Sequence, residues 1–248
     1  MSIRSWFLVL ILPVLTACVT VGGEPPTQNE KASKINVELG MGYLAQGNYE
    51  QSNQKLLKAI RQNPDSASAH WGYAYLQDIL MEKEVAAKHY KKATELDPKD
   101  SRAANNYGNF LCRNGREKES EKYFINALKD PLYGTPEFAY TNAARCLLRI
   151  NETAKAKQYL TRALAAKSDF GNALIEMAIL EFDEGKHENA KLYIDRFHLT
   201  AKPTARSLWL AIRNELEISE TSNVDELGQQ LESDFPRSTE LKSWLELQ

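Results

Sequence analysis

Residues of the same type recur along this chain at a fixed interval of 34 positions. Ala59, Ala93 and Ala127 are spaced in this way, and so are Pro64 and Pro98. Glycines follow the same register at intervals of 68 and 70 residues: Gly47, Gly115 and Gly185. A constant period of this length indicates one supersecondary unit stacked many times, in which each unit buries its apolar face only against its neighbours. Arrays of this kind bind other chains, so the central question becomes which partner is bound and where.

A period of 34 residues is typical of the tetratricopeptide repeat, a helix-turn-helix unit. In the first unit Gly40 would let two helices approach closely, Gly47 would take the positive φ of the turn, and Pro64 would end the second helix. We therefore predict an all-α fold, a right-handed α-solenoid of about six repeats. The expected units are residues 33–66, 67–100, 101–136, 137–170, 171–204 and 205–238, followed by a short C-terminal helix that packs Trp244 inward and completes the superhelix of residues 33–248.

Two units depart from the regular pattern. The interval from Ala127 to Ala163 is 36 residues, and two prolines and a glycine between residues 130 and 136 predict an enlarged loop there. The sixth unit is degenerate, and its second helix is polar on one side, which suits a terminal cap that shields the last apolar face from water.

The composition argues against several functional classes. The chain has 31 Lys and Arg residues against 33 Asp and Glu residues, a formal net charge of −2, so no overall positive field would attract nucleic acid. The four histidines show no metal-ligand spacing with one another or with cysteine, and we find no phosphate-binding loop or nucleophile elbow. We therefore expect a protein that is not an enzyme, with no cofactor, metal, nucleic acid or small-molecule substrate.

The N-terminus has the pattern of an exported protein. Arg4 precedes a short apolar stretch, residues 6–15, which is too short for a stable transmembrane helix. The segment Leu15-Thr16-Ala17-Cys18 then resembles the bacterial lipobox, in which the cysteine is lipidated and becomes the first residue after cleavage. We predict a signal peptide over residues 1–17, lipidation at Cys18 and a flexible tether over residues 18–32; the alternative is an ordinary signal peptide with a chance cysteine. Val19, not aspartate, follows the cysteine, a pattern that in Gram-negative lipoproteins implies sorting to the outer membrane.

Two further cysteines lie in the repeats, on the first helices of adjacent units. An exporting cell would allow Cys112 and Cys146 to pair, but thiols on neighbouring helices rarely reach disulfide geometry. We expect buried free thiols, with the disulfide as the alternative.

The first helix of each repeat is expected to line a concave groove. By analogy with other such repeats, the second, fifth, ninth, twelfth and thirteenth positions of a unit point into it. We predict that the partner contacts apolar and amide side chains at these positions: Val37, Met41, Leu44, Trp71, Tyr75, Asn105 and Asn109. The same positions add Ile79, Arg102, Arg113, Phe138, Arg145 and Arg149 to the groove. The alternative is that some of these side chains pack against the neighbouring repeat.

A lipobox followed by six such repeats resembles the type IV pilus pilotins, the PilF/PilW-type lipoproteins. Four segments carry the resemblance: residues 39–44 (LGMGYL), 105–111 (NNYGNFL), 130–133 (DPLY) and 205–213 (ARSLWLAIR). It covers nearly the whole mature chain, although Ser52 and Ser120 replace the alanine common in such repeats.

This resemblance implies a lipoprotein anchored on the periplasmic face of the outer membrane of a Gram-negative bacterium. Such a protein escorts the pilus secretin subunit and helps it to assemble into a ring. Two other classes stay open: a repeat scaffold lipoprotein of another envelope assembly machine, and an accessory subunit that positions an enzyme.

Overall fold

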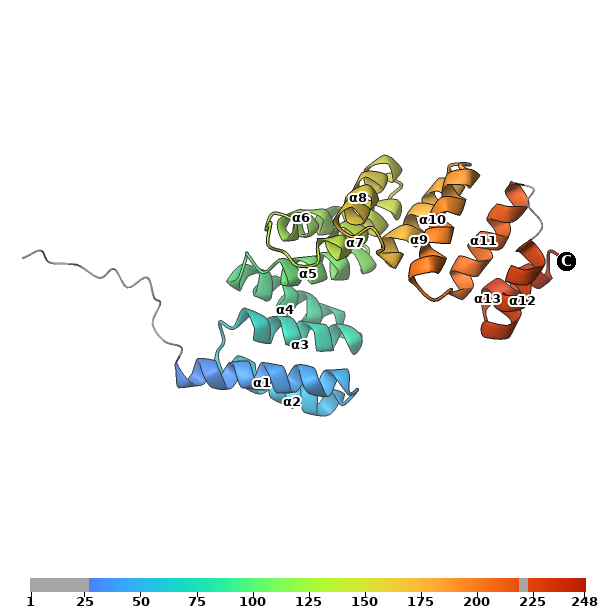
Figure 1. The fold of residues 1–248 in the computed structure, drawn as a ribbon. Coiled ribbons are helices and arrows are strands. Elements are labelled where there is room, and N and C mark those ends of the chain that lie inside the picture. The colour runs from blue at the N-terminus through green and yellow to red at the C-terminus, as the bar shows by residue number, and fades with distance from the viewer. Residues whose placement is uncertain (1–26, 219–222) are drawn as a thin grey trace, which may run out of the picture.

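The computed structural model describes residues 27–218 and 223–248. Over these residues it is all-helical, and helix pairs stack one after another along a curved path (Figure 1). The helices are α1 (Gln28–Ala45), α2 (Tyr49–Gln62), α3 (Ala67–Ile79), α4 (Lys83–Leu96), α5 (Ser101–Arg113), α6 (Glu117–Ala127), α7 (Pro136–Leu148), α8 (Thr153–Ala166), α9 (Gly171–Asp183), α10 (His187–Thr200), α11 (Ala205–Glu217), α12 (Val224–Asp234) and α13 (Thr239–Leu245). The prediction of an all-α stack of about six helix-turn-helix repeats is therefore confirmed.

The turns inside the first five repeats use the same backbone conformation. One residue per turn has a positive φ, and these residues follow the intervals of the sequence pattern, 34 residues with one of 36: Gly47, Met81, Gly115, Asn151 and Gly185. Glycine reaches this left-handed region without the steric penalty that a side chain adds. The glycines of the sequence pattern thus mark the turns, while Met81 and Asn151 occupy the same position without being glycine.

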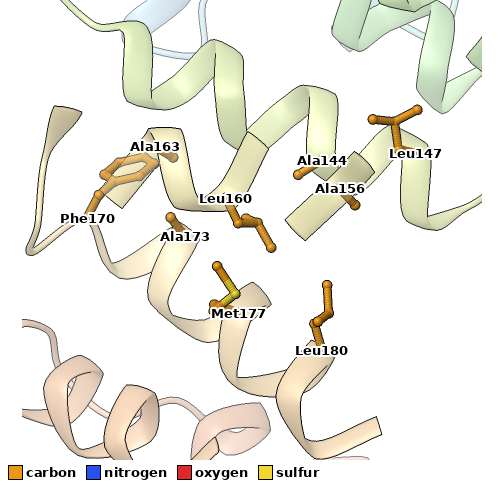
Figure 2. Packing of buried hydrophobic residues seen from close by; sticks show 9 residues of the cluster. All are labelled: Ala144, Leu147, Ala156, Leu160, Ala163, Phe170, Ala173, Met177 and Leu180. Atoms are coloured by element: carbon orange, nitrogen blue, oxygen red, sulfur yellow. The ribbon is translucent and has the colours of Figure 1, made fainter. Parts of the chain in front are cut away.

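The recurring alanines lie where the helices touch. Ala59, Ala93, Ala127 and Ala163 are all fully buried. Gly40 has a similar role in α1, since a Cβ atom there would lie 2.7 Å from Cγ of Leu56. Figure 2 shows one resulting core cluster, formed by side chains of α7, α8 and α9 around Leu160 and Met177. Small residues at fixed intervals therefore set the close helix spacing of the stack.

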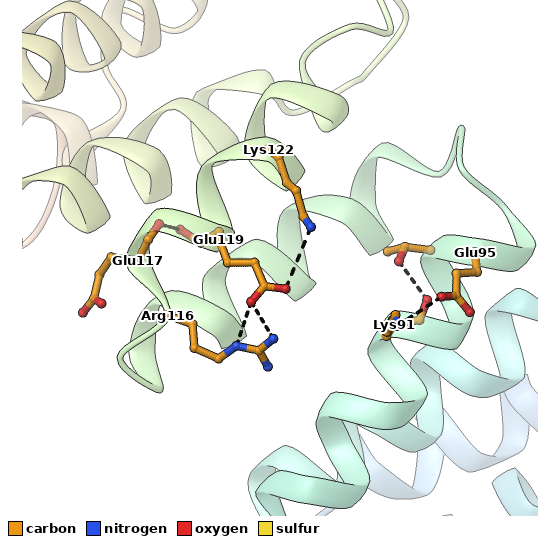
Figure 3. Close-up of polar contacts among 8 residues, drawn as sticks. Lys91, Glu95, Arg116, Glu117, Glu119 and Lys122 are labelled. Atoms are coloured by element: carbon orange, nitrogen blue, oxygen red, sulfur yellow. Dashed lines mark hydrogen bonds and ion pairs between the residues drawn. The ribbon is translucent and has the colours of Figure 1, made fainter.

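The first helices of the repeats form the inner, concave face. Helix α1 contacts α3, α5 contacts α7, and α9 contacts both α7 and α11; no consecutive second helices make comparable contacts in the described part of the chain. The second helices carry solvent-exposed charge pairs. In Figure 3, Arg116 and Lys122 both contact Glu119 of α6, and Lys91 contacts Glu95 of α4. Exposed pairs of this kind add little stability, so they mark a solvated outer face.

Cys112 and Cys146 form a disulfide, so the expectation of free thiols is wrong. Cys112 lies near the end of α5 and Cys146 near the end of α7, 34 residues apart in the sequence, and their Cα atoms are 5.7 Å apart. This distance lies within the range that disulfides require. Alanines of both helices, Ala104 in α5 and Ala143 in α7, are buried and let the helices come this close. The disulfide joins the third repeat to the fourth.

The connection between these two repeats is enlarged, as the 36-residue interval predicts. Eight residues, 128–135, separate α6 from α7, whereas four residues, 63–66, separate α2 from α3. Leu132 in this loop is exposed.

Helix α1 begins earlier than the sequence suggests. Thr27 caps it, because its hydroxyl accepts from the Glu30 backbone N–H while the Glu30 carboxylate accepts from the Thr27 N–H. This reciprocal arrangement stabilises a helix start, so residues 28–32 are helical and do not belong to a flexible tether. The predicted signal peptide, Cys18 and most of the tether lie outside the described residues. None of the helices in residues 27–218 and 223–248 has both the length and the apolar character needed to cross a membrane.

The C-terminal end is closed as predicted. Trp244 of α13 is buried against Leu208, Leu231 and other side chains of the sixth repeat. Gly228 of α12 makes room for it, since a Cβ atom at this position would lie 2.5 Å from the indole nitrogen. The outward side of α12 is polar, with Asp225, Glu226, Gln229 and Glu232 exposed.

Candidate partner-binding face

Three neighbouring side chains of α3 form an apolar patch on the concave face. Trp71, Tyr75 and Ile79 are spaced by four residues and therefore lie on one side of the helix. The Trp71 and Tyr75 rings stack nearly parallel, with centroids 5.9 Å apart and an interplanar angle of 7°. Tyr75 and Ile79 are 40% and 38% exposed, whereas Trp71 is half-buried. We call these three residues the aromatic surface.

Two contacts hold Trp71 in place. Its side chain packs against the core cluster that contains Tyr90 and Phe110. The guanidinium of Arg102, from α5, lies 4.9 Å from the ring centroid, close enough for a cation–π interaction. The aromatic surface is therefore a fixed platform, positioned by the second and third repeats together.

Two of the predicted partner-binding residues are buried in the core. Val37 packs with Ala59 and Ala69, and Leu44 packs with Leu56 and Leu76, so the expectation that these side chains face the groove is wrong. The reason is that α3 lies close against α1. Met41 sits between both clusters and is only half-buried.

The asparagines of α5 differ from each other. Asn105 is buried, and its amide oxygen accepts a hydrogen bond of 3.1 Å from Nδ2 of Asn142 in α7. It therefore links two repeats and does not face the groove as expected. Asn109, one turn further along, is half-buried. Of the seven predicted side chains, Met41, Trp71, Tyr75 and Asn109 thus remain partly accessible.

The predicted arginines connect neighbouring repeats. Arg113 of α5 donates to Asp78 of α3 over 2.6 Å, and Arg149 of α7 donates to Glu117 of α6 over 3.0 Å. Burial and the nearby Asp78 carboxylate raise the pKa of Tyr90, whose hydroxyl donates to Asp78. Phe138 of α7 rests against the Phe170 ring, with centroids 4.7 Å apart.

Sequence reasoning missed a second feature, in the C-terminal half of the concave face. A hollow of about 610 Å³ lies between α7, α9 and α11. Its lining combines three arginines with apolar side chains: Arg145, Arg149, Arg206, Leu148, Ile179 and Leu180. We call it the arginine hollow. Applying the same groove positions to the fifth and sixth units would have identified Ile179 and Arg206.

The chain matches known proteins over nearly its whole length. The tetratricopeptide repeat signature matches residues 37–78, 89–122 and 139–170. The sequence is 32% identical to the type IV pilus assembly protein PilF of Pseudomonas aeruginosa, over 98% of each chain. This chain belongs to the PilF family of type IV pilus biogenesis proteins.

Solved structures agree with membership of the PilF family. The structure of Pseudomonas aeruginosa PilF superposes with a TM-score of 0.82 at 31% identity, covering 90% of this chain and all of that one. PilW, a widely conserved type IV pilus biogenesis factor, superposes with a TM-score of 0.79 at 30% identity, covering 86% of this chain and 98% of PilW. The resemblance to PilF/PilW-type proteins is therefore confirmed, and the chain is a repeat protein of pilus biogenesis.

Proposed function

We propose that this protein is a pilotin: a lipoprotein that binds the type IV pilus secretin subunit and promotes its targeting to the outer membrane and its multimerisation. Family membership supports a role in pilus biogenesis. The observation that carries the binding role is the aromatic surface of α3, where two large apolar side chains are exposed beside a fixed indole.

The aromatic surface has the features of a protein-binding site. Trp and Tyr are enriched among the residues that dominate binding energy, because they bury a large area with little loss of side-chain freedom. Burying one such side chain is worth roughly 1.5–3 kcal/mol. An amphipathic helix or an extended apolar segment of the secretin would supply the complementary face.

Lipidation at Cys18 would complete the function. Acyl chains add about 0.8 kcal/mol per buried methylene, so several chains anchor a protein stably in a membrane. A secretin segment held on the concave face would then be kept next to the outer membrane, because one molecule connects both binding events. The anchored protein faces the periplasm in this proposal.

The first experiment removes the aromatic surface. The Trp71→Ala/Tyr75→Ala variant should capture much less secretin in a pull-down, while circular dichroism shows unchanged helix content. Because Trp71 also packs against the core, Tyr75→Ala/Ile79→Ala provides a second test that leaves the indole in place. Tyr49→Ala/Leu192→Ala is the matched control, since both residues are exposed on second helices. Capture that is equal in all variants would contradict the proposed surface.

The second experiment tests the pilotin role in cells. Deletion of the gene should abolish heat-resistant secretin multimers in outer-membrane fractions, and the unaltered gene should restore them. Restoration by Cys18→Ser should fail or be strongly reduced, because this variant cannot be lipidated. Normal multimers in the deletion strain would refute the pilotin role and favour a scaffold for another envelope assembly machine.

A further inference from the structure

The arginine hollow contains a buried carboxylate shared by two arginines. Oε1 of Glu176, in α9, accepts from Nε of Arg145 in α7 over 2.9 Å and from Nη1 of Arg206 in α11 over 3.2 Å. The Glu176 side chain is only 7% exposed, whereas Arg145 and Arg206 are 39% and 57% exposed. Three consecutive first helices therefore meet at this one carboxylate.

The shared carboxylate leaves one positive charge and many donors unused. A guanidinium carries five N–H donors in a planar fork, and each of these arginines uses one of them on Glu176. Two arginines against one carboxylate have a net charge of +1. Since Glu176 fixes the position of both side chains, their remaining donors are held in place at the wall of the hollow.

Most other charges around the hollow are already paired. Arg149 donates to Glu117, and Glu184 accepts from Lys157 and Lys186. Asp183 is exposed and lines both the hollow and its continuation along α11, where Arg213 lies over the Phe182 ring, 4.4 Å from its centroid. When Arg213 is counted against Asp183, the charge of +1 on Arg145, Arg206 and Glu176 remains the excess over the hollow and its continuation.

The walls beside the arginines are apolar. Leu148, Ile179 and Leu180 line the hollow itself, and Trp209 and Leu210 line its continuation along α11. A ligand that fits must present a carboxylate to the arginines and an aliphatic side chain to these walls. Bidentate arginine–carboxylate contacts are strong and specific in geometry.

We infer that Arg145 and Arg206 form a carboxylate-binding site for an acidic, leucine-containing extended segment of a protein partner. The carboxylate comes from a side chain or from the C-terminus of that segment. The site is separate from the aromatic surface, and the inference does not depend on the secretin being the partner there.

The test measures peptide binding to the full mature chain by isothermal titration calorimetry. The probe is a capped peptide in which aspartate alternates with leucine, and the control peptide has asparagine in place of aspartate. We expect the aspartate peptide to bind about tenfold more tightly, because hydrogen bonds to a charged carboxylate are stronger than those to a neutral amide. A third peptide, with asparagine and a free C-terminal carboxylate, distinguishes the two carboxylate sources; binding of either carboxylate peptide supports the site.

Variants then assign the binding to the two arginines. Arg145→Gln/Arg206→Gln should reduce affinity at least tenfold. Because this change leaves Glu176 buried without a charge partner, the triple variant with Glu176→Gln removes the buried charge as well and should show the same loss. Arg61→Gln/Arg162→Gln removes two exposed arginines from second helices and should change affinity less than twofold, since distant exposed charges are screened.

Several results would overturn the inference. Equal binding of all three peptides, no binding of any peptide to the unaltered chain, or unchanged binding by a folded triple variant would each do so. An equal loss in the Arg61/Arg162 control would show a non-specific charge effect and would also overturn it. Tyr75→Ala/Ile79→Ala should bind the aspartate peptide normally, so failure of the secretin proposal and failure of this one give different results.

Discussion

The two halves of the molecule are built from the same repeat but present different chemistry on the concave face. In α1–α6 the accessible feature is the aromatic surface of α3, and in α7–α13 it is the arginine hollow. The buried positions hardly differ, since Ala59, Ala93 and Ala127 in one half correspond to Ala163 in the other. The period thus constrains the residues between helices and leaves the groove positions free to specialise.

The halves are joined at a seam between the third and fourth repeats. The enlarged loop of residues 128–135 makes the connection along the chain, and the Cys112–Cys146 disulfide makes it across α5 and α7. In a repeat array, the free energy of unfolding is approximately the sum of the stabilities of the single repeats and of the interfaces between neighbouring repeats. A covalent link at the seam should therefore hold two chemically different halves together as one cooperative unit.

Removing the disulfide should produce the largest effect. The Cys112→Ala/Cys146→Ala variant loses a cross-link between residues 34 apart, which should lower the free energy of unfolding by about 3 kcal/mol. Urea denaturation followed by circular dichroism measures this loss. We also expect Trp71 in one half and Trp209 in the other to report different midpoints in single-tryptophan variants. Unaltered protein under reducing conditions is the control and should behave like the variant; an unchanged midpoint in both would contradict a stabilising role.

A smaller effect should follow from pH, and mainly in the N-terminal half. His89 of α4 stacks on His70 of α3, and their Nδ1 atoms are 2.8 Å apart. The Pro64 carbonyl can only accept, so Nε2 of His70 donates to it over 2.9 Å and His89 Nδ1 donates to His70 Nδ1. Burial, with additional contributions from His70 and Lys88, lowers the pKa of His89 from 6.5 to about 4.

The direction of the pH effect follows from this lowered pKa. Between pH 6.5 and about 4 the unfolded chain binds a proton at His89 that the folded chain does not, so stability falls as the pH drops through this range. Water screens the half-exposed ring, which makes the effect smaller than that of the disulfide. His89→Gln should flatten the dependence of the urea midpoint on pH. His198→Gln in the C-terminal half should flatten it less, because Asp195 opposes the lowering of the His198 pKa by burial; the reverse order would be evidence against this account.

The sequence predicted the scaffold well because steric constraints repeat with the period. Few residue types fit a fully buried helix contact or a turn with positive φ. An alanine or glycine that recurs with the period, such as Ala93 or Gly115, therefore identifies a helix contact or a turn. The groove was harder to predict. Val37 and Leu44 lie at repeat positions that were expected to face the groove, but both pack against residues of α3. Asn105 is buried because it accepts a hydrogen bond from Asn142 of the next repeat. These outcomes depend on how closely two neighbouring first helices pack, which no single repeat encodes.

The same limit explains the two features that were missed. The disulfide requires α5 and α7 to approach within 5.7 Å between the cysteine Cα atoms, and the spacing of the cysteines along the sequence does not guarantee this distance. Glu176 is shared by arginines from the repeats before and after its own. Interactions that span three repeats are not apparent from the composition of any one of them.

The smallest predicted effect compares the two turns that lack glycine. Met81 has φ 64° and is 70% exposed, so its side chain gains little from burial while its backbone is strained. Met81→Gly should raise the free energy of unfolding by about 0.5–1 kcal/mol. The change removes the steric penalty of a side chain in the left-handed region, and the greater conformational entropy of glycine in the unfolded chain offsets part of this gain.

Asn151, at the same position in the C-terminal half, has φ 62°, but asparagine tolerates this region. Asn151→Gly should therefore gain about 0.3 kcal/mol or less. Gly115→Ala is the reciprocal control: nothing lies within 4 Å of an added Cβ atom, so its expected loss of about 1 kcal/mol would come from backbone strain alone. The urea midpoints of Met81→Gly, Asn151→Gly and Gly115→Ala, each compared with that of the unaltered protein, measure these three effects. Equal gains at Met81 and Asn151 would contradict the prediction, because they would show that φ alone, and not the identity of the turn residue, determines the change in stability.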